Sequence, residues 1–133
     1  MIIMIDDEKY RMVHVYDMLE MSGYSVKLVD NVDDALDVIK KDKNKIKAII
    51  LDIMMPWGNV FKAEDTKYGT QTGYKFFFMI REIIGEKIPI IIYTAYKGGD
   101  ILNDLKQEKN SVVRSKADTS AKDILKLLKD YMR

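Results

Sequence analysis

Short apolar runs alternate along the chain with longer segments in which apolar residues recur at helical spacing. The apolar runs, rich in Ile and Val, predict five strands at about residues 2–6, 25–29, 46–51, 88–93 and 112–115. The segments with helical spacing predict five helices, one beginning after Asn31 and the others at about residues 8–21, 73–84, 99–109 and 119–132. Strands that alternate with helices are typical of an α/β protein with a parallel sheet.

The composition of each run indicates where its strand lies in the sheet. The runs at 46–51 and 88–93 are almost wholly aliphatic, which is typical of central strands covered on both faces. The run at 25–29 alternates between apolar and polar residues, which predicts a strand nearer the edge. The stretch 57–72 follows no sustained period, and loops of this length in a compact domain are usually functional or mobile.

The overall composition limits the domain count and the partners. A chain of 133 residues has the length of one domain, so we expect a single domain over residues 1–133. The 22 basic and 21 acidic side chains nearly balance, which gives no general attraction to nucleic acid or to an anionic membrane. No apolar run is long enough to span a bilayer, and the amino terminus lacks a signal-peptide pattern. Without cysteine, disulfides and thiolate metal sites are excluded, and we expect a cytoplasmic location.

Four of the predicted strands end on side chains that can handle phosphate. In chain order these are Asp6 with Asp7, Asp52, Thr94 and Lys116. Because the carboxyl ends of strands in an open parallel sheet line one crevice, we expect these side chains to meet. Taken alone, the first acidic pair could equally mark the start of a helix, since acids favour that end.

Carboxylates gathered in one crevice repel each other. Two of them about 4 Å apart repel by about 4 kcal/mol at an effective dielectric constant near 20, so either a proton is retained or a cation binds. A hard divalent cation coordinated by oxygen is the natural partner, and Mg²⁺ is the usual one where phosphate is handled. Asp52 is the candidate nucleophile, because the chain has no cysteine and its single histidine lies elsewhere. Lys116 would stabilise the charge on a transferred phosphoryl group, and Thr94 could donate its hydroxyl to a phosphoryl oxygen.

With these motifs the chain resembles the receiver domain of response regulators, the aspartate-phosphorylated half of two-component signalling. The resemblance rests on the acidic pair, on Lys116 placed 22 residues after the threonine, on Thr94-Ala95, and on the string Asp52-Ile53-Met54-Met55-Pro56. It implies a flavodoxin-like, doubly wound, five-stranded parallel sheet in the strand order 2-1-3-4-5. It also implies that Asp52 is the phosphoacceptor. The resemblance further implies a Mg²⁺ site formed by Asp6 through water, Asp7, Asp52 and the backbone carbonyl of Met54.

The same resemblance implies a way of signalling. The phosphoryl group would come from a histidine kinase or a phosphotransfer protein, and the output would be a changed surface offered to an unknown downstream protein. The chain would be a stand-alone receiver rather than an enzyme, without direct contact to nucleic acid or membrane. Met54 and Tyr96 cannot orient a hydrolytic water as carboxylate or amide groups could, which predicts slow self-dephosphorylation.

Three features depart from the family pattern, and one of them is Ala117, which replaces the proline common after the lysine. The stretch 57–72 is longer than is usual before the glycine that opens the third helix, and it could either shield the acceptor site or dock a partner. Trp57 and Phe61 within it could pack the stretch down or contact another protein. Val113 stands where family members often carry an aromatic residue that acts with the threonine.

These departures leave other functions open. One alternative is a pseudo-receiver, which keeps the fold and binds proteins but is never phosphorylated. Another is a hydrolase with an aspartyl-phosphate intermediate. Such enzymes usually need a second acid two residues after the nucleophile, where this chain has Met54, so the hydrolase is the weaker alternative.

Overall fold

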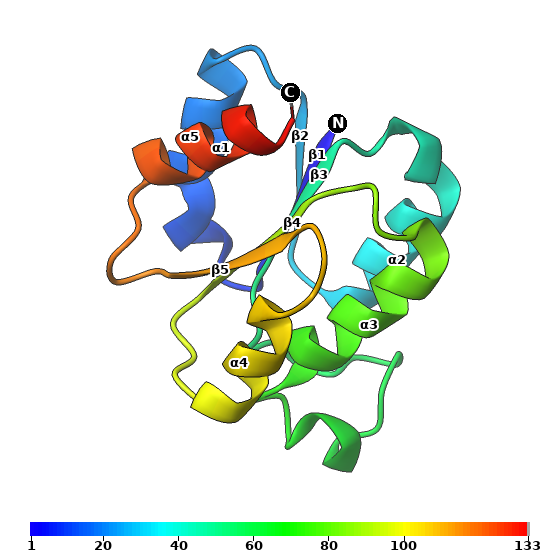
Figure 1. The fold of residues 1–133 in the computed structure, drawn as a ribbon. Helices are drawn as coiled ribbons and strands as arrows, with labels where there is room; N and C mark the ends of the chain where they lie inside the picture. Colours follow the sequence, from blue (N-terminus) through cyan, green and yellow to red (C-terminus); the bar gives the residue numbers. More distant parts are fainter. Residues whose placement is uncertain (133) are drawn as a thin grey trace.

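The computed structural model describes residues 1–132, which form a five-stranded parallel sheet in the order β2-β1-β3-β4-β5 (Figure 1). The strands are β1 (Ile2–Ile5), β2 (Val26–Val29), β3 (Ala48–Leu51), β4 (Ile90–Thr94) and β5 (Ser111–Ser115). The helices are α1 (Lys9–Met21), α2 (Val32–Asp42), α3 (Thr72–Ile84), α4 (Gly99–Lys106) and α5 (Ala121–Tyr131). The doubly wound α/β fold and its strand order are therefore confirmed, with β2 at the edge as predicted.

Two hydrophobic cores hold the helices against the sheet. Helices α1 and α5 cover one face, where Leu19 of α1 and Leu128 of α5 are fully buried (Figure 1). Helices α2, α3 and α4 cover the other face, and their buried side chains include Ala35, Ile39, Phe76, Phe77, Ile80, Ile101 and Leu105. A fully buried side chain of this size contributes about 1.5–3 kcal/mol to folding. Strands β1, β3 and β4 are buried along their whole length, which confirms the prediction made for the runs that form β3 and β4.

Helix starts follow the side-chain chemistry of the sequence. Asn31 caps α2 as expected, since its side chain accepts the Asp34 N–H at 2.8 Å. A capping box opens α5, in which Ser120 and Asp123 each accept the backbone N–H of the other. Among residues 1–132, no helix combines the length and the apolar character needed to cross a membrane.

Some element ends differ from the sequence prediction for local reasons. Strand β4 begins later than predicted because Pro89 has no backbone N–H, so the ladder starts at Ile90, whose N–H donates to the Asn110 carbonyl at 3.1 Å. Helix α4 ends at Lys106 rather than near 109. The chain then passes through Asn110 in the left-handed region, with a φ of 53°, on its way to β5.

The stretch 57–72, here called the β3–α3 loop and ending at Thr72, the first residue of α3, is folded against the domain. The Phe61 ring lies edge-on to the Phe76 ring of α3, with centroids 6.4 Å apart. Trp57 makes a similar contact with Tyr68 inside the loop, also at 6.4 Å between centroids. The sequence left open whether Phe61 packs the loop down or contacts another protein. In the structure Phe61 packs the loop onto its own domain.

The β3–α3 loop is also attached to α2 and has a little regular structure of its own. The Asn59 N–H donates to the Asp33 carboxylate near the start of α2, at 3.0 Å from Oδ1. A single 3₁₀ turn, Glu64–Thr66, lies in the second half of the loop. The loop thus has a defined path from the end of β3 to the start of α3.

Candidate functional site

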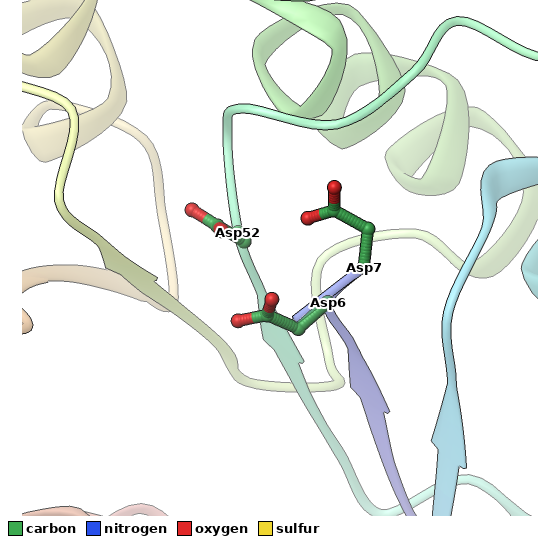
Figure 2. Close-up of side chains that lie close together, drawn as sticks. All are labelled: Asp6, Asp7 and Asp52. Carbon is green, nitrogen blue, oxygen red and sulfur yellow. The ribbon is translucent and has the colours of Figure 1, made fainter. Parts of the chain in front are cut away.

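Three carboxylates converge at the carboxyl end of the sheet. Asp6 and Asp7 follow β1 and Asp52 follows β3, and these two strands are hydrogen-bonded neighbours. Figure 2 shows the three side chains close together beyond the ends of the two strands. One oxygen from each carboxylate lies within 4.8 Å of the others, with Asp6 and Asp52 buried and Asp7 exposed. The doubly wound topology thus brings together the acids that the strand endings predicted.

A single ammonium group joins this cluster. Lys116 follows β5, and its Nζ lies 2.7 Å from Asp6 Oδ2 and 3.1 Å from Asp52 Oδ2. Its side chain is only 17% exposed, so these ion pairs are shielded from solvent. The Lys116 backbone N–H donates to the Thr94 carbonyl at 2.9 Å, which ties the end of β5 to the end of β4. Lys116 is therefore held in place by the ion pairs of its side chain and by the backbone hydrogen bond to Thr94.

The excess of acid over base shows in the pKa values. Burial raises the pKa of Asp6, and this effect outweighs the opposing hydrogen bond from Lys116. Although Asp7 is exposed, partial desolvation of its carboxylate, followed by the charge of Asp52, also raises the pKa of Asp7. Burial alone would lower the pKa of Lys116, but the hydrogen bond to Asp6 and the charges of both partner acids raise it. Independently of these shifts, three carboxylates face one ammonium group, so a further positive charge would be accepted there.

The Asp52 carboxylate has a fixed orientation. Its Oδ1 accepts the Ile53 N–H at 2.7 Å, while Oδ2 faces Lys116. The following backbone is covered closely by the first turn of α3, where the Gly73 N–H donates to the Ile53 carbonyl at 2.8 Å. A Cβ on Gly73 would come to 2.0 Å from the Asp52 carbonyl oxygen, so only glycine permits this approach.

Thr94 and Met54 border the cluster and contact other groups. Thr94 is buried at the end of β4, and its Oγ1 accepts the Tyr96 N–H at 3.1 Å. That contact uses a lone pair of the oxygen, so the hydroxyl proton can still be donated. Met54 lies between two buried neighbours, Ile53 and Met55, and its own side chain is 37% exposed.

Several contacts at the site were not expected from the sequence. The Gln71 amide donates to the Tyr96 hydroxyl at 3.1 Å, which joins the β3–α3 loop to the segment after β4. Thr72 is buried and donates its hydroxyl to the Met55 carbonyl. An open groove beside the acids is lined by Asp7, Glu8, Met54, Met55, Pro56, Trp57, Tyr68, Gly69 and Thr70. No sequence period or motif predicts these contacts, because the two residues of each contact lie far apart in the sequence.

The donor set suits a hard divalent cation. All three converging side chains offer carboxylate oxygens, and Asp7 is exposed, so an ion could reach the cluster from solvent. Hard cations such as Mg²⁺ and Ca²⁺ take oxygen ligands, whereas softer metals favour imidazole or sulfur. The residues present therefore fit the ion that the sequence predicts.

Comparison with known proteins adds independent evidence. The response regulator receiver domain family matches the chain over residues 2–116. No relative was found among curated proteins.

Similar solved structures have the same fold. A CheY-like response regulator receiver domain protein from Methanospirillum hungatei is 17% identical, with a TM-score of 0.76 over 98% of this chain and 91% of that chain. A receiver domain protein from Clostridium thermocellum is 20% identical, with a TM-score of 0.76 over 98% and 92%. A response regulator from Burkholderia pseudomallei, solved with a phosphorylated aspartic acid, a calcium ion and citrate, is 20% identical, with a TM-score of 0.72 over 96% and 65%. With the family matched over most of its length, this chain belongs to the response regulator receiver domains.

Proposed function

We propose that the chain is a phosphoacceptor switch in which Asp52 receives a phosphoryl group from a histidine kinase or a phosphotransfer protein in a Mg²⁺-dependent reaction. The observation that carries this proposal is the position of Lys116, whose Nζ lies within 3.1 Å of both Asp52 and Asp6. An ordinary surface lysine would remain solvated rather than lie among buried acids. The regulator from Burkholderia pseudomallei, which carries a phosphorylated aspartic acid, supports the same role by analogy.

The residues of the chain would share the reaction as follows. A carboxylate oxygen of Asp52 attacks the phosphorus of a phosphohistidine, and the phosphorus–nitrogen bond breaks with its electron pair going to the imidazole. An acyl phosphate forms on Asp52. Lys116 offers a fixed positive charge to the phosphoryl oxygens, and the Thr94 hydroxyl donates a hydrogen bond to one of them.

The acidic cluster would hold the metal ion. Asp7, Asp52 and the Met54 carbonyl would bind Mg²⁺ directly, and Asp6 would bind it through water. When bound, Mg²⁺ supplies positive charge that offsets both the carboxylates and the incoming phosphoryl oxygens. The convergence of three carboxylates on one ammonium group supports this assignment, because a bound cation would offset the remaining negative charge.

The output would be a change of surface rather than a chemical product. Phosphorylation would draw Thr94 toward the phosphoryl group and away from the Tyr96 N–H that it now accepts. The segment after β4 leads into α4, so the face formed by α4, β5 and α5 would change and be offered to a downstream protein. The chain is not proposed to be an enzyme in its own right. Loss of its phosphoryl group would be slow, because Met54 and Tyr96 offer neither a carboxylate nor an amide to orient water.

Intact mass after incubation with acetyl phosphate and Mg²⁺ tests the proposal. We expect wild type to gain one phosphoryl group, and we expect no gain in Asp52→Asn or in wild type with excess chelator. Asp37→Asn on the exposed side of α2 is the matched control and should be phosphorylated like wild type. A wild-type protein that gains no mass under conditions where it is folded would favour the pseudo-receiver instead.

A further inference from the structure

The segment that follows Asp52 is anchored on both sides of Met54. The Ile53 and Met55 side chains are buried in the core, whereas that of Met54 is more than a third exposed. The Met54 carbonyl is one of the oxygens assigned above to Mg²⁺. Its position therefore depends on how firmly the backbone of residues 53–55 is held.

The far end of the β3–α3 loop holds this backbone through both polar groups of Met55. The Met55 N–H donates to the Gly69 carbonyl at 3.1 Å. The Met55 carbonyl accepts the hydroxyl of Thr72, a side chain with no exposed surface. Gly73, the next residue, donates its N–H to the Ile53 carbonyl. Residues 69–73 thus contact the chain immediately before and immediately after Met54.

The loop adopts an unusual backbone to make these contacts. Lys67, Tyr68 and Gly69 have φ values of 52°, 56° and 90°, all in the left-handed region. Such conformations are unfavourable for residues other than glycine and persist only where surrounding contacts determine them. The buried hydroxyl of Thr66 supplies one such contact by accepting the Gly69 N–H at 3.1 Å. A Cβ on Gly69 would lie 3.1 Å from the Met55 carbonyl oxygen, so glycine allows the close approach.

We propose that Thr72 and Gly69 are positioning residues for the metal ion, which fix the Met54 carbonyl so that the site favours Mg²⁺ over Ca²⁺. The inference rests on the proposed function, since it requires Mg²⁺ at the acidic cluster. Mg²⁺ demands near-octahedral geometry with short bonds of about 2.0–2.1 Å, whereas Ca²⁺ accepts longer bonds and variable geometry. Loosening one ligand should therefore weaken Mg²⁺ binding more than Ca²⁺ binding.

Calorimetric titration with MgCl₂ and with CaCl₂ tests the inference on the whole chain. Thr72→Val keeps the shape of the side chain and removes the hydroxyl donated to Met55. We expect its Kd for Mg²⁺ to rise about tenfold, the lower end of the effect of lost outer-shell contacts. The Kd for Ca²⁺ should rise much less, and Thr72→Ser should restore the wild-type preference.

Thr70→Val is the matched control from the same loop. Thr70 is exposed, and its hydroxyl donates to the Lys67 carbonyl at 2.8 Å rather than to Met55. We expect this variant to bind both ions like wild type. Gly69→Ala provides a second variant should Thr72→Val fail to fold, and it should show the same selective loss of Mg²⁺.

The outcomes separate this inference from the proposed function. If wild type binds neither ion, the metal site itself is wrong and both proposals fall. If wild type binds Mg²⁺ but Thr72→Val matches Thr70→Val, only the positioning role is overturned. Equal losses of Mg²⁺ and Ca²⁺ would also overturn it, because they would indicate general damage rather than lost geometry.

Discussion

The acidic cluster and the β3–α3 loop lie beside each other at the end of β3, but they are stabilised in different ways. In the cluster, three carboxylates face a single ammonium group, and burial raises the pKa of Asp6 and Asp7. In the loop, polar groups are paired within the chain, as when the Thr66 hydroxyl donates to the Ala63 carbonyl and accepts the Gly69 N–H. Aromatic contacts such as that of Phe61 with α3 complete the packing.

The difference indicates what each region should respond to. The cluster has an unbalanced charge, so a cation that binds only the folded chain should stabilise it, by about 2.7 kcal/mol at a concentration one hundred times its Kd. Apart from Gly69 and Thr72, which contact Met55, the loop is satisfied by hydrogen bonds and packing, so the contribution of residues such as Phe61 should not depend on an ion. Variants in the two regions should therefore differ in how Mg²⁺ changes their stability.

The largest effect is expected from removing the ammonium group. Lys116→Met leaves Asp6 and Asp52 buried without their shared partner, and breaking a buried ion pair costs about 3 kcal/mol or more. Urea unfolding without metal should show this loss, and added Mg²⁺ should recover part of it. Lys97→Met, at an exposed position, should unfold like wild type. A Lys116→Met protein as stable as wild type would show that the ion pairs contribute nothing to the fold.

A smaller loss of stability is expected from the loop. Phe61→Ala removes the half-buried ring that packs against Phe76 and should lower the free energy of unfolding by about 1–2 kcal/mol. The loss should be the same with and without Mg²⁺, because no charge is changed. Tyr10→Ala is the control, since Tyr10 is 94% exposed and should change stability by less than about 0.5 kcal/mol. A loss that Mg²⁺ restores would contradict the separation of the two regions.

A gain of stability is expected from removing one acid. Asp7→Asn relieves repulsion with Asp52 and should raise the metal-free free energy of unfolding by about 0.5–1 kcal/mol, a small effect because Asp7 is exposed and screened by solvent. The same change should abolish most of the stabilisation by Mg²⁺. Thermal unfolding of this variant beside Asp37→Asn measures both effects, and a destabilised Asp7→Asn would contradict the charge imbalance.

The metal-free free energy of unfolding should also depend on pH, through the raised pKa values of Asp6 and Asp7. Burial raises the folded-state pKa of Asp6 and Asp7 above the ordinary carboxyl value near 4. Between that value and the raised pKa values the folded chain holds more protons than the unfolded chain, so metal-free stability should fall as the pH rises. The fall should be shallower in Asp7→Asn. An unchanged slope would mean that Asp7 does not contribute to it.

The smallest effect concerns the lifetime of the phosphorylated state. Met54→Asn places an amide that can orient water beside Asp52 and should speed loss of the phosphoryl group about threefold, equivalent to about 0.7 kcal/mol in the barrier. Met54→Leu keeps the side chain apolar and should leave the rate unchanged. Intact mass measures the rate at which each phosphorylated protein loses its phosphoryl group. Equal rates in all three proteins would show that Met54 does not control this loss.

The same contrast explains what the sequence could predict. The acids and Lys116 each follow an apolar run, and parallel topology places the ends of such runs together, so local pattern was sufficient to locate them. The contact of Thr72 with Met55 depends on the path of the intervening loop, which has no period. The pairing of Gln71 with Tyr96 likewise joins two segments that only the folded chain brings together. The sequence predicts strand and helix ends only approximately. A single backbone group, such as the missing N–H of Pro89, can move an end without changing the apolar pattern.

The most direct test of the central claim is Mg²⁺-dependent binding of beryllofluoride, a tetrahedral analogue of the phosphoryl group, followed by ¹⁹F NMR. We expect one bound beryllofluoride per chain in wild type, only when Mg²⁺ is present, and none in Asp52→Asn. Binding that persists without Mg²⁺, or that is unchanged in Asp52→Asn, would contradict a phosphoryl site shared by the acidic cluster, the metal ion and Lys116.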